Sequence, residues 1–334
     1  MPSSMRPLPS RRPEPFSGCL FAASSDDAEQ QAALLRGWNQ SYTQISRGKF
    51  FGSVAEIQLG GGRLFREFTG RSLHQNGVLP PEYIAIGLPL QMKGPAIFCG
   101  MQGDPGAMHV FSGSDGFDFY SPGELMMAGM VVPRQALSNL LPDCENDLIL
   151  ATFNSAHLAQ AEATAAGAVK EFINGVLEIS ESAPHLLGNE AIMTTLYQGM
   201  MSNLAALVVE SSGLKPDRSG LARRCAIVAK AKDAVLSRPD RPICIAELCR
   251  IVGVSRRTLQ YCFQDVLDLS PAAFLRAVRL NRVRRMLRDA PSVTEAAAFW
   301  GFWHFGHFAR DYAAMFGELP SQTHRRLRKK PSGV

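Results

Sequence analysis

The sequence lacks the features that mark membrane, secreted and zinc-binding proteins. Its 334 residues contain no run approaching 18 uninterrupted apolar residues, so we expect no transmembrane helix and no membrane partner. The opening stretch, MPSSMRPLPSRRPEPFSG, has no apolar core of the kind found in signal peptides, so we interpret residues 1–25 as a disordered lead-in to a cytoplasmic protein. The seven cysteines include no CxxC pair, which favours reduced thiols that pack as small apolar groups.

Motifs typical of enzymes are missing as well. The chain has no GxSxG nucleophile elbow, no P-loop and no GxGxxG, so we expect no catalytic residues and no cofactor. A cupin-like metal enzyme is the rival class, because such enzymes are also built on small β-rich domains. Their metal needs converging histidine and carboxylate ligands. Residues 50–132 offer only His74 and His109, without an HxH pair, so we expect no bound metal.

Acidic residues outnumber basic ones in the first two thirds of the chain, and the balance then reverses. Residues 1–219 carry 14 Lys+Arg against 21 Asp+Glu, whereas residues 220–334 carry 21 against 9. The net charge of +5 therefore conceals a C-terminal third with a balance of +12. Such a concentration of basic residues in one segment is typical of a domain that binds a polyanion such as nucleic acid.

The pattern up to residue 141 predicts a β-rich domain with a few helices. Residues 26–45 have the periodicity of a helix. From about 50 to 132, short apolar runs alternate with glycine and proline turns, as in a β-barrel or a β-sandwich. Residues 133–141 predict a helix with proline at its first position. We therefore expect a barrel-like N-terminal domain, and an α+β protein overall.

Two apolar seams with steps of three and four residues then predict long helices. The first seam contains Leu158, Ala161, Ala165, Ala168, Phe172, Val176 and Ile179, and the second contains Met193, Leu196, Met200, Leu204 and Leu207. Such seams pack either within one chain or between the subunits of a homodimer, and both uses stay open. Residues 211–220, SSGLKPDRSG, have the composition of a linker, which places two domains at 26–210 and 221–330.

Beyond the linker the pattern is helical throughout. Residues 243–263, ICIAELCRIVGVSRRTLQYCF, have the spacing of a helix-turn-helix unit. Gly253 supplies the turn, Ser255 caps the second helix, and Leu259 and Phe263 point inward. The outward residues in the first half of that helix are Arg256, Arg257, Gln260 and Tyr261. Arginine suits guanine edges and glutamine suits adenine edges in the major groove.

Ser270 and Pro271 open a connecting helix of about 17 residues, roughly 26 Å long. The inward residues of this helix include Phe274, Leu275, Val278, Val283 and Leu287, and its other faces carry Arg276, Arg279, Arg282, Arg284, Arg285 and Arg288. The first pattern then returns: Ser292 and Glu295 have the spacing of a capping box, and Gly301 supplies a turn. The second helix of this unit points His304, His307 and Arg310 outward.

Residues 221–327 resemble the DNA-binding domain of the AraC/XylS family of bacterial transcription regulators. The matching stretches are SRRTLQYCF, FLRAVRLNRVR, WGFWHFGHFARDY and FGELPS, in that order. The resemblance implies an all-α domain whose two helix-turn-helix units, joined by a long helix, read adjacent major grooves of double-stranded promoter DNA, with RNA polymerase as a further partner. Cys244 and Trp303 depart from the family pattern, because a small polar residue is usual at both positions.

The resemblance also implies roles for individual residues. It implies base contacts by Arg256, Arg257, Gln260 and Tyr261 in the first unit, and by His304, His307 and Arg310 in the second. We add Ser255, Thr258, Arg276 and Arg284 as candidates for phosphate contacts. We expect the first unit to dominate sequence recognition, because the second begins with a tryptophan and contains Gly306, a poor helix former.

The N-terminal part resembles the regulators of ethanolamine-utilisation operons in the stretches WNQSY, RGKF, EIQL and LFREFTGRSL. This resemblance implies a domain that senses a small molecule and a protein that activates transcription, with the effector left open. The candidates for a ligand pocket are Trp38, Phe65, Tyr83 and Phe98. We therefore predict a cytoplasmic, nucleoid-associated regulator that responds to a ligand. The alternatives are a cupin-like metal enzyme fused to a DNA-binding domain, and an architectural DNA-binding protein that needs no ligand.

Overall fold

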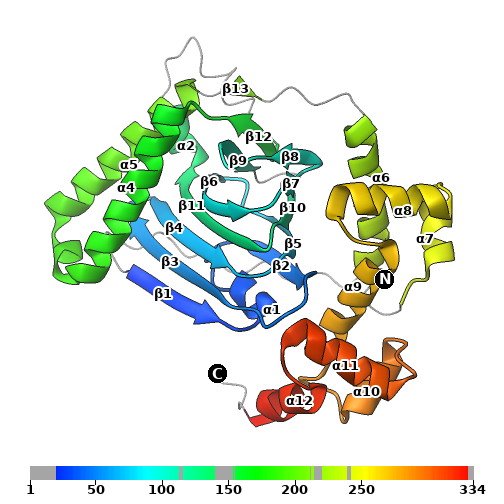
Figure 1. Cartoon of the computed structure of the whole chain (residues 1–334). Coiled ribbons are helices and arrows are strands. Elements are labelled where there is room, and N and C mark those ends of the chain that lie inside the picture. The colour runs from blue at the N-terminus through cyan, green and yellow to red at the C-terminus, as the bar shows by residue number, and fades with distance from the viewer. Residues whose placement is uncertain are drawn as a thin grey trace, which may run out of the picture.

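The computed structural model describes residues 20–112, 116–139, 153, 155–210, 212–213, 220–238 and 242–329. Strands dominate up to residue 133, and every element from α6 onward is a helix (Figure 1). The chain therefore has a β-rich N-terminal domain and a helical C-terminal domain. No helix in these ranges is both long enough and apolar enough to cross a membrane.

The strands of the N-terminal domain form two antiparallel sheets. The eight-stranded sheet has the order β1 (Leu20–Ser25), β3 (Gly52–Leu59), β4 (Gly62–Thr69), β11 (Glu124–Pro133), β6 (Tyr83–Lys93), β9 (Ala107–Ser112), β12 (His157–Gln160) and β13 (Ser212–Gly213). The five-stranded sheet has the order β2 (Asn39–Gln44), β5 (Leu73–Val78), β10 (Phe117–Ser121), β7 (Ala96–Phe98) and β8 (Met101–Gly103). The expected barrel is therefore wrong: the described strands divide between two sheets that do not close on each other.

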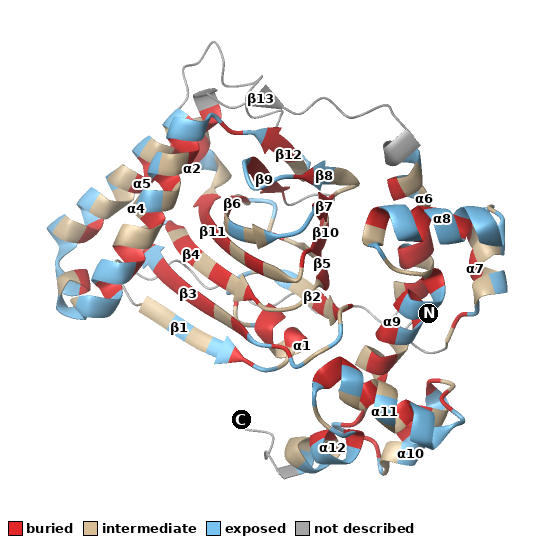
Figure 2. Cartoon of the chain, in the orientation of Figure 1, coloured by how far each residue is buried: buried red, intermediate tan, exposed pale blue. Residues whose placement is uncertain are grey.

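Alternating side chains along the strands produce the layers of this domain. In β6, Ile84, Ile86 and Leu88 belong to the cluster under the helices, whereas Ala85 belongs to the cluster between the sheets. Two helices, α4 (Ala163–Ser182) and α5 (Glu190–Glu210), cover the outer face of the eight-stranded sheet (Figure 2). The short elements α2 (Arg134–Ser138) and η1 (Pro184–Gly188) complete the domain, and α2 confirms the helix expected within 133–141.

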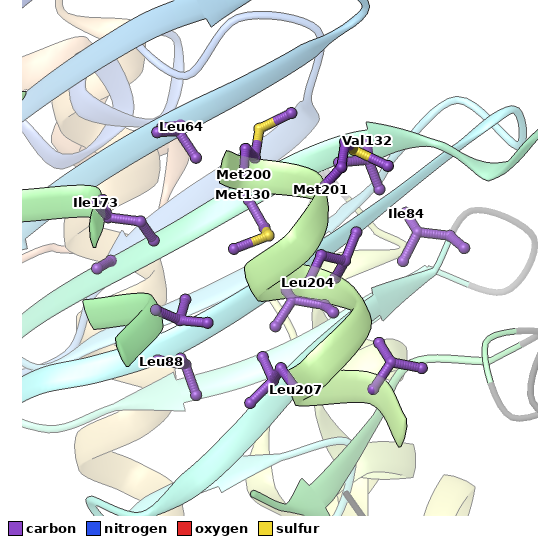
Figure 3. Packing of buried hydrophobic residues seen from close by; sticks show 14 of the residues in the cluster. Leu64, Ile84, Leu88, Met130, Val132, Ile173, Met200, Met201, Leu204 and Leu207 are labelled. Carbon is purple, nitrogen blue, oxygen red and sulfur yellow. The ribbon is translucent and has the colours of Figure 1, made fainter. Parts of the chain in front are cut away.

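The two helical seams pack against the chain's own sheet. Figure 3 shows Met200, Leu204 and Leu207 of α5 beside strand residues such as Leu64 and Ile84. This second seam agrees with the sequence pattern, apart from the half-buried Leu196. The first seam is right only in part. Its helix begins at residue 163, and Ala165 and Val176 are buried as expected. Ala168 and Ile179 are exposed, however, and the other buried apolar positions of α4 include Val169, Ile173 and Leu177.

Long-range strand pairing explains the errors in the N-terminal part. Leu20–Ser25, expected in a disordered lead-in, pairs with β3 from Leu20–Ile57 to Ser25–Gly52. The helix expected over 26–45 is limited to α1 (Ala28–Ala32), because residues 39–44 pair with β5. Leu158, expected in a helix, pairs with His109 of β9. In each case the sheet satisfies backbone groups that a helix would have bonded locally. Most of the predicted linker, residues 211 and 214–219, lies outside the described residues.

Seven helices in the described ranges form the C-terminal domain. They are α6 (Gly220–Leu236), α7 (Ile245–Val252), α8 (Arg256–Leu267), α9 (Pro271–Met286), α10 (Val293–Phe299), α11 (Phe305–Phe316) and α12 (Pro320–Lys329). One apolar cluster joins α6, α7, α8 and the first half of α9, and another joins the second half of α9 to α10 and α11. Each predicted helix-turn-helix segment thus has its own core, and α9 connects the two.

The C-terminal domain packs against the five-stranded sheet. Ile45, Ile97 and Tyr120 of the N-terminal domain join the apolar cluster of α6, α7 and α8. Further along, the Asn281 side chain of α9 donates a hydrogen bond to the backbone carbonyl of Gln44 (2.9 Å). The Gln44 side chain in turn donates to the carbonyl of Met315 in α11 (2.7 Å). Both halves of the helical domain therefore touch the N-terminal domain.

Candidate nucleic-acid interface

The turn between α7 and α8 is built as the sequence predicts. Gly253 has a φ of 78°, in the left-handed region that a residue with a Cβ resists. The Ser255 hydroxyl caps α8 by accepting a hydrogen bond from the backbone amide of Thr258 (3.1 Å). Leu259 and Phe263 are fully buried and fix one face of α8 to the core. The opposite face of the helix is therefore held toward solvent.

The exposed face of α8 carries the predicted base-contacting residues. Arg256, Arg257, Gln260 and Tyr261 are all exposed, and Tyr261 keeps 59% of its surface. The guanidinium of Arg224 in α6 lies over the Tyr261 ring at 5.8 Å. The backbone amides at the start of a helix attract anions, and the two arginines add positive charge there. This end of α8 is suited to the phosphates and base edges of DNA.

The turn between α10 and α11 also contains a left-handed glycine, but it is longer than the first turn and ends in a different cap. Gly301 has a φ of 77°, and Ser292 caps α10 by accepting from the amide of Glu295 (3.1 Å). His304 stands at the N-cap of α11 and makes no side-chain cap hydrogen bond. Its neighbour His307 lies 2.7 Å from the guanidinium of Arg310, measured between Nδ1 and Nη2. His304, His307 and Arg310 are exposed, as the sequence predicts.

The phosphate-contact candidates fall into three environments. Ser255 and Thr258 lie at the exposed start of α8, with their hydroxyl oxygens 2.9 Å apart. Arg276 keeps half of its side chain exposed while it pairs with Asp311 of α11 (3.1 Å). These three positions remain accessible to a phosphate group. Arg284 differs from them, because only 9% of its surface is exposed.

Arg284 was placed wrongly as a phosphate contact. Its guanidinium pairs with Asp27 of the N-terminal domain (2.6 Å) and with Glu318 beyond α11 (2.9 Å), and it stacks on the Phe316 ring at 4.7 Å. Burial alone would raise the pKa of Asp27, but the charge of Arg284 and its hydrogen bond lower it below the ordinary value. The residue therefore joins the two domains, and it is buried at that contact instead of facing solvent.

A second buried ion pair joins the domains at α6, and the sequence pattern gave no sign of it. The ammonium of Lys232, which is 1% exposed, contacts both carboxylate oxygens of Asp118 in β10 and lies 4.0 Å from the Tyr120 ring centroid. The ring of His74 lies 3.1 Å from the same carboxylate. Burial alone would raise the pKa of Asp118, but the His74 hydrogen bond and the Lys232 charge lower it to about 2.

The predicted ligand-pocket residues share one cluster between the two sheets. Phe65 and Phe98 are buried in it, and Trp38 and Tyr83 pack against its edge. The Trp38 ring makes edge contacts with three phenylalanines at centroid distances of 5.2 to 6.1 Å. These packing contacts account for the aromatic residues, and the four candidates therefore remain a prediction about the ligand.

His109, which the sequence offers as a possible metal ligand, lies in the same space. It is fully buried, 5.1 Å from the Phe98 ring, and neither ring nitrogen makes a hydrogen bond of good geometry to a described residue. Burial lowers its pKa to about 4. His74 lies on the other face of the five-stranded sheet beside Asp118, so the two histidines do not converge on one metal.

A family model and several known proteins match parts of this chain. Residues 248–326 match the model of a helix-turn-helix domain family. The "Probable thc operon regulatory protein" of Rhodococcus erythropolis is 40% identical over 100 residues, which cover 29% of this chain and 30% of that protein. The "XylDLEGF operon transcriptional activator" of Pseudomonas putida is 35% identical over 94 residues, which cover 27% and 29%. The chain thus spans less than a third of the length of these relatives.

Solved structures are similar as well. Among them is that of "a probable AraC family transcriptional regulator from Rhodopseudomonas palustris CGA009", 40% identical, covering 31% of this chain and 98% of that chain with a TM-score of 0.29. Together with the family model and the relatives, the residues quoted above identify the C-terminal domain as a DNA-binding helix-turn-helix domain of the AraC/XylS type.

Proposed function

We propose that the protein is a ligand-responsive transcription regulator that binds promoter DNA through α8 and α11. One observation carries the proposal. Arg256, Arg257, Gln260 and Tyr261 stand exposed at the start of α8, while the Gly253 turn and the buried face of the helix hold them in place. The C-terminal balance of +12 charges supplies the general attraction to DNA on which sequence recognition is superimposed.

The connecting helix suggests how two grooves are reached. α9 has 16 residues, so it is about 24 Å long. Its buried residues belong to the cores of both helix-turn-helix units, so it fixes their separation. Two units held in this way can enter successive major grooves on one face of the duplex, which lie about 34 Å apart. We assign Arg257 and Gln260 to base edges, and Ser255, Thr258 and Arg276 to phosphates.

We assign the N-terminal domain to effector binding, in the aromatic space between its sheets. Trp38, Phe65, Tyr83 and Phe98 supply apolar contacts in this assignment. His109 supplies the polar one, because its buried ring nitrogens make no good hydrogen bond within the described residues. The domain contacts the helical domain through Lys232 and Arg284, so a ligand that shifts the sheets has a direct route to the DNA-binding helices. Activation of transcription, contact with RNA polymerase and a homodimer belong to the same proposal.

The deciding experiment selects DNA sites from a random duplex pool with the purified full chain. Arg257→Ala should then weaken binding to the selected site by about 1–3 kcal/mol, or roughly five- to 150-fold, if Arg257 makes a bidentate contact to guanine. Arg257→Lys is the matched control, because it keeps the positive charge but loses the planar guanidinium. It should discriminate less between the selected site and other sequences, while the salt dependence of its DNA affinity stays the same. A pool that enriches no sequence would overturn the proposed function.

A further inference from the structure

The start of α11 exposes large apolar side chains where the domain has no need of them. Among the described residues, seven large hydrophobic side chains are exposed, and three of these lie between residues 299 and 305. Trp303 is the most exposed of the seven, at 72%, and Phe305 is 43% exposed. Both flank His304, at the end of the helix that we assign to DNA. An exposed aromatic patch on a soluble protein usually marks a binding surface.

The core of the second unit is complete without the rings of Trp303 and Phe305. The neighbouring aromatics Trp300, Phe302 and Phe308 are each less than 8% exposed, so they fill the interior of the second unit. Phe302 and Phe308 pack on each other at 5.1 Å, and Phe308 packs on Tyr312 at 5.7 Å. Since the backbone of the turn points these residues inward, Trp303 and Phe305 between them point outward.

Gly306, next to Phe305, is the second sign of a partner. Gly253, Gly301 and Gly317, which follow the ends of helices in this domain, have φ values of 71° to 78° and need the freedom of glycine. Gly306 has no positive φ, and a Cβ built on it would meet no atom within 4 Å. Alanine would fit the free chain and favour the helix. A bare glycine at an exposed helix start instead suits the close approach of another molecule.

The surroundings favour DNA as that molecule. His307 and Arg310 lie exposed on the same helix, with Arg276 of α9 paired to Asp311 close by. The exposed start of α11 presents no asparagine or glutamine, the side chains that recognise adenine by paired hydrogen bonds. Another way to recognise an A·T pair from the major groove is an apolar contact with the 5-methyl group of thymine. Two exposed rings beside a bare glycine offer that contact.

We propose that Trp303 and Phe305 pack against thymine methyl groups in the major groove, so that the second unit recognises A·T pairs by apolar contact. This inference rests on the proposed DNA-binding function. It assigns the two units different ways of recognising bases: hydrogen bonds from α8 and methyl contacts from α11. His307 and Arg310, further along the same helix, then supply hydrogen bonds and charge.

The experiment replaces thymine by deoxyuracil, one position at a time, in the duplex selected by the full chain. Deoxyuracil removes only the methyl group and keeps base pairing. Each contacted thymine should lose about three- to fivefold in affinity on replacement. In Trp303→Ala or Phe305→Ala, the duplex with thymine should bind more weakly and replacement should have no further effect at the same position. Trp303→Phe keeps an apolar ring and should keep the methyl dependence.

Two further variants make the result specific. Leu319→Ala removes another exposed apolar side chain of the same domain and should keep the thymine effect of the wild-type chain. Gly306→Ala should leave thermal stability equal or higher and weaken binding to the selected duplex. Equal affinity of the wild-type chain for thymine and deoxyuracil at every position would overturn the inference while the proposed function stands. So would variants that lose transcription activation but keep full DNA affinity, because the rings would then bind a protein.

Discussion

The two helix pairs, α7 with α8 and α10 with α11, share a left-handed glycine in the turn but differ in chemistry. Both turns contain a glycine with a φ of 77° to 78°, and both second helices have 12 residues. In the first pair, α8 is capped by Ser255 and presents arginines and a glutamine. In the second pair, α11 starts at His304, which makes no cap hydrogen bond, and presents aromatic rings. The glycine turn and the buried face set the geometry, so the exposed side chains are free to diverge.

The pairs also differ in how they attach to the N-terminal domain. The first pair is attached through α6, where buried Lys232 contacts Asp118, whose side chain keeps 34% of its surface exposed. The second pair is attached through Arg284, which pairs with Asp27 and Glu318 at side-chain exposures of 10%, 14% and 23%. Because water reaches Asp118 more easily than any group around Arg284, the second attachment should respond more strongly to the loss of a charge.

Arg284→Ala should have the largest effect of the changes considered. It leaves the Asp27 carboxylate in a poorly hydrated site without its cation, which should cost about 3–5 kcal/mol of unfolding free energy, whereas Glu318 keeps its pairing with Arg326 (2.7 Å). Urea unfolding followed by circular dichroism measures this loss. Under conditions where the variant is folded, the salt dependence of DNA binding should equal that of the wild-type chain. A weaker dependence of DNA affinity on salt concentration in the variant would mean that Arg284 does contact a phosphate, as the sequence predicts.

Arg285→Ala is the matched control on the next residue of the same helix. Arg285 pairs with Glu29 at 2.7 Å, but both side chains are about 40% exposed. Its loss should therefore change the unfolding free energy by less than about 1 kcal/mol. Equal losses in the two variants would mean that burial does not strengthen the attachment of the second pair.

Asp118→Asn tests the attachment of the first pair. It leaves the Lys232 ammonium buried without its counter-charge, and we expect a loss of about 2–3 kcal/mol, less than for Arg284→Ala because Asp118 is partly hydrated. Asp289→Asn, the same change on an exposed carboxylate at the end of α9, should have little effect. The change is measured by urea unfolding at neutral pH. No difference between the two variants would mean that Lys232 finds another partner.

The same variant has a defined pH dependence. The pKa of Asp118 is lowered to about 2 from an ordinary value of 3.8, so the unfolded chain binds a proton at this residue before the folded chain does. The stabilisation by Asp118 is therefore complete above pH 4 and is lost as the pH falls toward 2. The wild-type and Asp118→Asn unfolding curves should converge over this range. A difference that stayed constant down to pH 2 would contradict the lowered pKa.

The first pair and the connecting helix could be predicted because their signals are local. Gly253, Ser255, Ser270 and Pro271 each act within one turn of the chain, and the buried positions follow a helical period. The role of Arg284 could not be predicted, because it depends on Asp27, which is 257 residues away. A pattern along α9 cannot distinguish an arginine that faces DNA from one that faces another domain.

For the N-terminal domain, the sequence predicts that short strands dominate but not how these strands pair. Its topology depends on strands that find distant partners: β11 lies between β4 and β6, and β10 lies between β5 and β7. Local periodicity therefore failed over 26–45, where part of a predicted helix is an edge strand. It also gave no reason to pair His74, Asp118 and Lys232, which come from two sheet strands and a helix of the other domain.

The smallest predicted effect concerns the caps, where the two pairs differ most directly. Ser255→Ala should destabilise the first pair by about 1 kcal/mol, because it removes the acceptor for the Thr258 amide. The reverse change, His304→Ser, should stabilise the second pair by up to about 1 kcal/mol if the missing hydroxyl is the only difference. Thermal unfolding of the two variants gives both values, with His304→Ala as the control that removes the ring without adding an acceptor.

The backbone decides how this last comparison is interpreted. Ser255 has φ −67° and ψ 157°, which directs its hydroxyl toward the helix start, whereas His304 has φ −100° and ψ 86°. A gain for His304→Ser over His304→Ala would mean that the turn adjusts and that the histidine is kept at a cost in stability for the contact it makes with DNA. No gain would mean that Trp303 and Phe305 hold the backbone at residue 304 in a conformation from which a serine hydroxyl cannot cap α11. In that case the exposed rings set the geometry of the second pair as well as its surface.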